Sequence, residues 1–174
     1  LRTRRQRQMC IRDRIKLVSN SGSIKAKKIK IDAGSKGAAE ISGNLNSNNE
    51  KGKGGTIEIT GKDIDVNSAT ITANGQTGGG KVLIGGDWQG SGDLLQAKYL
   101  DIDSNSKITA NALTSGSGGT IVAWSDIKNS NSLTRVSGTL EAKGIDGNGG
   151  QIETSGAVLD LSLIHISEPT RQDR

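Results

Sequence analysis

Apolar and polar residues alternate in short runs through most of this chain, and Gly, Asn and Ser separate the runs. In residues 56–60 (TIEIT), both isoleucines are predicted to point inward and the glutamate outward. Alternation with period two, broken by turn residues, favours strands of about three to five residues over helices. Residues 34–55 are the loosest part, with one strand predicted around residues 39–41. We therefore expect an all-β fold.

The same alternation predicts which residues of the other strands face inward. They are Ile24, Ala26, Ile29, Ile31, Ile57, Ile59, Ile64, Val66, Ala69, Ile71, Ala73, Val82, Ile84, Leu100, Ile102, Ile108, Ala110, Leu133, Val136, Leu140, Ala142, Ile152 and Val158. The stretch 121–124 (IVAW) leaves two registers open, with either Ile121 and Ala123 or Val122 and Trp124 inward.

A Gly-Gly pair followed by a polar and a β-branched residue occurs four times. The copies begin at Gly54, Gly79, Gly118 and Gly149, which spaces them 25, 39 and 31 residues apart. There is also a second echo, in which residues 63–74 match residues 101–111 with one residue deleted, and residues 137–143 resemble both more weakly. Each unit is too small to bury its own apolar face, so neighbouring units must stack. The sequence predicts a solenoid of stacked β-coils.

The two ends of the chain do not share this pattern. Residues 1–14 and 161–174 contain no Gly. The codons ATG TGT ATA AGA GAC encode Met9–Asp13, and the reverse complement of the same adapter strand, read as CTG TCT CTT ATA CAC ATC, encodes residues 161–166. We interpret both ends as unstructured tails translated from a sequencing adapter and exclude them from the fold. The predicted domain is a β-helix repeat fragment over residues 15–160.

Excluding the tails changes the charge of the chain. The full sequence has 23 Lys and Arg against 18 Asp and Glu, but the tails hold eight of the basic and three of the acidic residues, which leaves 15 of each. Nucleic-acid binding inferred from net charge loses its support, and we expect no nucleic-acid partner. The lysine-rich run 25–30 is interpreted as a solvated strand face, in preference to a polyanion-binding patch. Patterned apolar residues at zero net charge favour order over disorder.

Three stretches carry a resemblance to a known family. They are GGKVLIGGDWQGSGDLLQA (79–97), DSNSKITANALTSGSGGTIVAWSD (103–126) and SGTLEAKGIDGNGGQIETSGAVLDL (137–161). Together they resemble the repeats of large secreted adhesins of the filamentous haemagglutinin type, which are exoproteins of two-partner secretion. The resemblance implies a right-handed parallel β-helix, exported through an outer-membrane transporter partner and displayed on a Gram-negative cell surface. Residues 129–133 (NSNSL) depart from the family pattern, which continues there through a short polar link to an aromatic residue.

Candidate chemistry is sparse in residues 15–160. Without His or Cys, the commonest catalytic bases, thiol nucleophiles and zinc ligands are missing. Four carboxylates, expected to face solvent, flank the inward isoleucines of the two echoing strands: Asp63, Asp65, Asp101 and Asp103. If these strands stack, like charges lie on neighbouring strands, where Ca²⁺ would bridge them. The interpretation that we favour is a solvated face neutralised by Lys62, Lys98 and Lys107.

Two other groups of side chains have a structural and a functional interpretation. Trp88 and Trp124 would either stack on sugars or have a structural role, in which they cover an edge of the coil or fill a wide turn, and we favour the structural role. The Asn and Thr residues of the two ITAN motifs (71–74 and 108–111) are expected to form ladders along the stack that satisfy backbone groups in the turns.

From these observations we expect a non-enzymatic shaft fragment of a secreted or surface-displayed bacterial adhesin. It would need no cofactor, and its receptor would be a glycan or protein of a host cell or matrix. One alternative is the stalk of a contact-dependent toxin-delivery exoprotein. Another is a β-helix polysaccharide lyase, which would use the four aspartates with Arg135, the one arginine in residues 15–160.

Overall fold

The computed structural model describes residues 16–161. The interpretation of residues 1–14 and 162–174 as adapter-derived tails therefore concerns parts of the chain outside the described residues. Leu161, which the sequence analysis places in the second tail, is the last residue of a strand. The ordered coil thus extends one residue beyond the predicted boundary at residue 160.

The strands form three parallel sheets. Sheet A contains β1 (Leu17–Asn20), β4 (Ala38–Ile41), β7 (Asp63–Val66), β10 (Tyr99–Ile102), β13 (Leu133–Val136) and β16 (Val158–Leu161). Sheet B contains β2 (Ser23–Lys25), β5 (Asn44–Asn46), β8 (Thr70–Thr72), β11 (Lys107–Thr109) and β14 (Thr139–Glu141). Sheet C contains β3 (Lys28–Asp32), β6 (Thr56–Thr60), β9 (Lys81–Ile84), β12 (Thr120–Trp124) and β15 (Gln151–Ser155).

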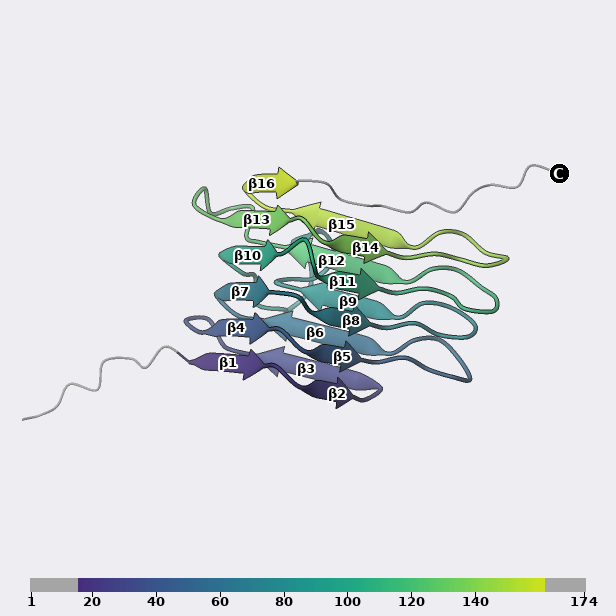
Figure 1. The fold of residues 1–174 in the computed structure, drawn as a ribbon. Helices are drawn as coiled ribbons and strands as arrows, with labels where there is room; N and C mark the ends of the chain where they lie inside the picture. Colours follow the sequence, from purple (N-terminus) through teal and green to yellow (C-terminus); the bar gives the residue numbers. More distant parts are fainter. Residues whose placement is uncertain (1–15, 162–174) are drawn as a thin grey trace, which may run out of the picture.

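Every third strand along the chain lies beside its predecessor in the same sheet. One coil therefore consists of one strand from each sheet, and the coils stack from β1–β3 at one end to β16 at the other (Figure 1). All strand pairs within the sheets are parallel. The predicted all-β solenoid is confirmed, and it is a parallel β-helix.

The core is made of columns of aliphatic side chains that repeat from coil to coil. In sheet B, Leu45, Ile71, Ile108 and Leu140 lie in register and are fully buried. Burying one such side chain contributes about 1.5–3 kcal/mol. A single coil has no core of its own, because its inward side chains are buried only when the coils above and below cover them.

Sheet A corrects one part of the predicted core. Leu133 and Val136 were both predicted to point inward, but they are three residues apart and cannot share one face of a strand. Val136 and Thr134 point inward and are buried, whereas Leu133 is half-buried on the outer face. The Thr134 hydroxyl lies 2.8 Å from Ser125 Oγ and 2.8 Å from the Ser155 carbonyl oxygen, which satisfies it inside the core. Val158, also predicted inward, pairs with Leu133 and is exposed.

Two further differences lie in the loose segment and in sheet C. Residues 34–55 contain two strands where the sequence predicts one, because Leu45 buries itself between two asparagines in β5. In β12 the residues on both faces of the strand are buried. Ile121 and Ala123 join the main core, while a second apolar cluster forms on the outer face of sheet C. This cluster contains Leu83, Val122 and Trp124, with Trp88 and Leu94 packed against it.

The Gly-Gly repeats mark places where consecutive coils touch through their backbones. A Cβ atom on Gly80 would lie 2.1 Å from the Gly55 carbonyl oxygen, and one on Gly119 would lie 2.1 Å from that of Gly80. The four pairs precede β6, β9, β12 and β15 of sheet C, so each of these four coils has one pair, whereas no pair precedes β3 in the first coil. The spacings differ because the loops after β9 (85–98) and β12 (125–132) have different lengths. The family-divergent NSNSL segment falls largely within the second loop.

Candidate functional site

The outer face of sheet A carries two rows of side chains that run along the stack. The first row contains Leu17, Ala38, Asp63, Tyr99, Leu133 and Val158. The second, which we call the charged row, contains Ser19, Glu40, Asp65, Asp101, Arg135 and Asp160. In each row, successive residues sit on adjacent strands, about 4.8 Å apart.

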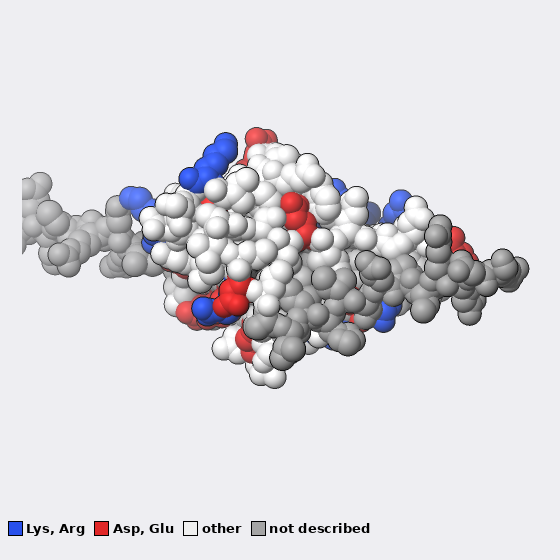
Figure 2. Space-filling view, turned by 90° about the horizontal axis from the view of Figure 1, so that it is seen from above, with Lys and Arg blue, Asp and Glu red and all other residues white. Residues whose placement is uncertain are grey.

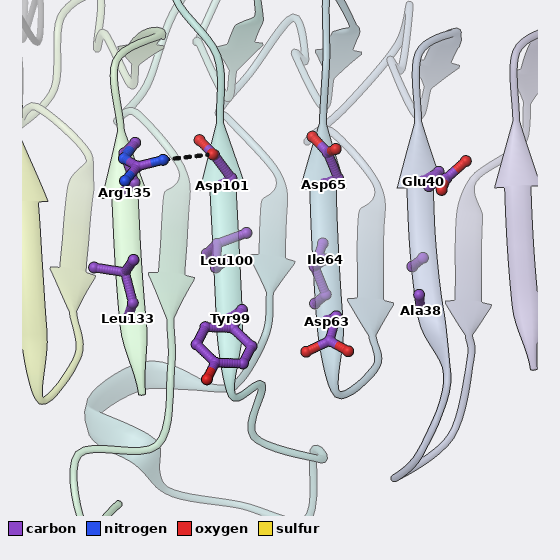
Figure 3. A pocket seen from close by; sticks show the side chains of 11 residues that line it. Ala38, Glu40, Asp63, Ile64, Asp65, Tyr99, Leu100, Asp101, Leu133 and Arg135 are labelled. Carbon is purple, nitrogen blue, oxygen red and sulfur yellow. Dashed lines mark hydrogen bonds and ion pairs between the residues drawn. The ribbon is translucent and has the colours of Figure 1, made fainter. Parts of the chain in front are cut away.

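Arg135 binds the carboxylates on both sides of it in the charged row. Its Nη1 lies 3.1 Å from Asp101 Oδ2 and its Nε lies 3.1 Å from Asp160 Oδ2. Figure 3 shows Arg135, Asp101, Asp65 and Glu40 at one level of four neighbouring strands. The hydrogen bond that Arg135 donates to Asp160, and then the charge of Asp101, raise the pKa of Arg135.

Asp65 lies between Glu40 and Asp101 and pairs with no cation among the described residues. Partial burial raises the pKa of the Asp65 carboxyl, and the neighbouring charges of Asp101, Glu40 and Asp103 raise it further. Like charges directly opposite each other in a sheet are destabilising. Asp65 is therefore the point on this face with the least compensated negative charge.

The expected neutralising lysines account for only part of this face. Lys62 Nζ lies 3.7 Å from Asp63 Oδ2, as expected. Lys98 Nζ instead lies over the ring of Tyr99, 4.9 Å from its centroid. The cation beside Asp101 is Arg135, because strand register places it on the next coil. Lys107 is the first residue of β11 in sheet B, and its charge is one of the contributions that lower the pKa of the Glu141 carboxyl.

The four candidate calcium ligands do not converge. Only Asp65 and Asp101 face each other on adjacent strands, whereas Asp63 pairs with Tyr99 in the first row. Asp103 lies beyond the end of β10, where it accepts hydrogen bonds from Ser68 N and from Ser106 Oγ. In residues 16–161, no three His, Cys, Asp or Glu side chains are grouped to hold a metal ion.

Asp103 has a structural role in a turn. Partial burial pushes the pKa of the Asp103 carboxyl upward, but hydrogen bonds from Ser106 and Ser68 outweigh it and lower that pKa. The sequence echo aligns Asp63 with Asp101, but the register pairs Asp65 with Asp101. The echo therefore misplaces the first carboxylate pair by two residues, although it correctly pairs Ile71 with Ile108.

A depression of about 380 Å³ lies over β4, β7, β10 and β13, and we call it the sheet A groove. Tyr99 and Leu133 supply apolar surface along it, and Ala38 leaves room because its side chain is small (Figure 3). Asp65 and Asp101 line the same space. The sequence alone does not reveal this groove, because Ala38, Tyr99 and Leu133 become neighbours only through the register of distant coils.

The two tryptophans cover the outer face of sheet C. Trp124 is only 3% exposed, and its Nε1 donates a hydrogen bond to Gln96 Oε1. A Cβ on Gly86 or on Gly90 would lie 2.5 Å from the indole, so the loop after β9 rests directly on it. Trp88 is partly buried against the same cluster. The tryptophans thus pack as structural residues, but on the outer face of sheet C, which differs from the predicted position at an edge of the coil or in a wide turn.

The lysine run at the start of the chain lies on an exposed strand face, as predicted. Lys28 Nζ lies 2.8 Å from Glu58 Oε1 on the next coil, and Lys25 Nζ lies 3.8 Å from Glu50 Oε1. Both lysines are more than half exposed. The part of the chain that the structure describes contains no helix suited to crossing a membrane.

No protein-family model matches the chain, and no curated protein sequence matches it. The functional interpretation therefore depends on the residues and the geometry described above.

Proposed function

We propose that residues 16–161 are a segment of the β-helical shaft of a larger bacterial adhesin, secreted or displayed on the cell surface. The observation that carries the proposal is the open core at both ends of the stack. Leu159 and Leu161 occupy inward positions in β16 but are 43% and 46% exposed, whereas Leu100 and Ile102 at matching positions in β10 are buried.

The other end of the stack is open in the same way. Ile24 in β2 is in register with Leu45, yet Ile24 is 37% exposed and Leu45 is fully buried. Viewed from above the β16 end, most of the visible described surface is uncharged (Figure 2). Solenoids need polar capping repeats at their ends to remain soluble. The exposed apolar residues at the two ends of the described stack therefore support a larger protein with further coils.

The remaining parts of the proposal come from the family resemblance. On that basis, export uses an outer-membrane transporter partner, and attachment is to a glycan or protein of a host cell or matrix. The shaft separates the binding region from the cell, and its rigidity comes from the columns of buried aliphatic residues and the Gly-Gly backbone contacts. The stalk of a toxin-delivery exoprotein would use the same segment, with a toxin domain downstream.

The testing experiment is long-read sequencing of the source DNA across both ends of the segment. We expect the reading frame to continue into further Gly-Gly repeats before residue 16 and after residue 161. Beads coated with the recovered protein should then adhere to host cells or matrix, with and without any downstream domain. A genomic reading frame that encodes both tails and stops would contradict the shaft proposal. Loss of adhesion when a downstream toxin domain is removed would favour the toxin-delivery stalk.

A polysaccharide lyase is the less supported candidate. The sheet A groove does bring Asp65, Asp101 and Arg135 together on one outward face. However, Arg135 is bound on both sides by carboxylates, which favours a structural role for it. An assay for unsaturated products from uronic-acid polymers, with and without Ca²⁺, tests this candidate directly. Turnover abolished by Asp65→Asn would establish it.

A further inference from the structure

We propose that the sheet A groove docks an extended, lysine- or arginine-containing peptide segment of a partner protein. The cationic head of one side chain would bind Asp65, and its hydrocarbon stem would lie against Tyr99 and Leu133. This inference holds for the chain whether or not it belongs to an adhesin shaft.

Charge complementarity identifies the occupant as cationic. Asp65 has a carboxylate on each side, Glu40 and Asp101, and pairs with no cation among the described residues. Burial and these neighbours raise the pKa of Asp65, so its negative charge is unfavourable in the unoccupied groove. A cation placed there would relieve that repulsion, and an anionic or uronic-acid ligand would increase it.

The apolar part of the groove identifies the shape of the occupant. Tyr99 is 41% exposed and Leu133 is half-buried, and both border the same depression as Asp65 (Figure 3). Lysine and arginine have an apolar stem and a charged head, which match an apolar surface beside a carboxylate. A simple inorganic cation would leave this apolar surface uncovered.

Arg135 sets where the cationic group lies along the stack. It already neutralises Asp101 and Asp160, and its own positive charge repels a second cation at β13. The cationic head is therefore placed over β4, β7 and β10, beside Glu40 and Asp65. The two side-chain rows run along the stack, so an extended segment would lie across the strands.

The test uses the full chain and two fluorescently labelled peptides, Gly-Lys-Leu-Lys-Gly and its acidic counterpart Gly-Glu-Leu-Glu-Gly. Fluorescence anisotropy measures binding, and NMR amide shifts locate it. We expect saturable binding of the lysine peptide alone, with shifts in β4, β7 and β10 and weakening at high salt. Asp65→Asn should weaken binding about tenfold, the loss expected for one charged hydrogen bond. Asp93→Asn, an exposed carboxylate outside the groove, should leave binding unchanged.

Several results would overturn the proposal. They are no binding of the lysine peptide, equal binding to the wild type and to Asp65→Asn, and shifts confined to strands outside the groove. Preferential binding of a neutral oligosaccharide would assign the groove to a glycan instead. Glu40→Gln is a second variant that removes a neighbouring charge from the groove, and it should also weaken the binding of the lysine peptide.

Discussion

The side-chain oxygen of Asn74 accepts a hydrogen bond from the backbone N–H of Asn111, one coil further on, at 2.8 Å. The same bond joins Asn48 Oδ1 to the N–H of Asn74 at 2.7 Å, and Asn111 Oδ1 to the N–H of Lys143 at 2.7 Å. A ladder of asparagines thus follows sheet B along the stack and supplies acceptors to backbone groups at the start of the long loops. The asparagine part of the ladder expected from the ITAN motifs is confirmed. The threonine part is wrong, because the buried hydroxyls of Thr72 and Thr109 make no hydrogen bond among the described residues.

Asn74→Ala should lower the free energy of unfolding by about 1–3 kcal/mol, because it leaves the partly buried N–H of Asn111 without its acceptor. Asn74→Asp, which keeps an acceptor oxygen, should cost less. The matched control is Asn131→Ala in an exposed loop position, which should change stability little. Urea unfolding followed by circular dichroism measures all three. Equal losses for Asn74→Ala and Asn131→Ala would show that the ladder does not stabilise the fold.

Asp65→Asn should raise the melting temperature at neutral pH, because it removes a carboxylate from between Glu40 and Asp101. The pKa of Asp65 is raised above its ordinary 3.8 in the folded chain. Between pH 3.8 and the raised value, the folded state binds more protons than the unfolded state, so stability falls as pH rises through this window. The higher melting temperature of Asp65→Asn relative to the wild type should be fully present above this pH range and absent below it.

Thermal unfolding of Asp65→Asn and the wild type at a series of pH values tests this expectation, with Asp93→Asn as the control. A variant whose advantage is the same at low and neutral pH would contradict the electrostatic explanation. If Asp65→Asn raises the melting temperature and also weakens peptide binding, the Asp65 carboxylate lowers stability while it contributes to binding.

Gly80→Ala should destabilise the chain by about 1–3 kcal/mol or more, because its Cβ would overlap the backbone of the coil below. The overlapping atom is the Gly55 carbonyl oxygen, at 2.1 Å, and a backbone atom yields less easily than a flexible side chain. Gly22→Ala is the matched control, since nothing lies within 4 Å of the added atom and its φ is not positive. Chemical unfolding compares the two, and similar stabilities would refute the close-contact role of the Gly-Gly pairs.

Ile108→Ala should cost about 2–5 kcal/mol, because Ile108 is fully buried in a column between Ile71 and Leu140. Leu159→Ala at the open end should cost about 1 kcal/mol or less, since nearly half of that side chain is already exposed. In the longer shaft that we propose, a following coil would cover Leu159, and Leu159→Ala should then be as costly as Ile108→Ala. If its cost stayed small in the longer protein, Leu159 would not be covered by a following coil.

Local pattern was enough to predict the strands and most of the core. Alternation within one strand is independent of distant residues, so Ile57, Ile59, Ile64 and Val66 could be assigned inward from their immediate neighbours. Repetition of Gly-Gly units then indicated stacked coils, since no unit buries its own apolar face. The parallel pairing of successive coils confirms that step.

The sheet A groove was decided by tertiary structure. Which residue stands beside Asp65 depends on the register between coils, and the loops at 85–98 and 125–132 differ in length, so sequence spacing does not reveal it. The echo therefore paired Asp101 with Asp63 in place of Asp65, and the partnership of Asp101 with Arg135 was not foreseen. Hydrophobic alternation determines which face of a strand is buried, whereas contacts between outward side chains follow only from how the coils are aligned.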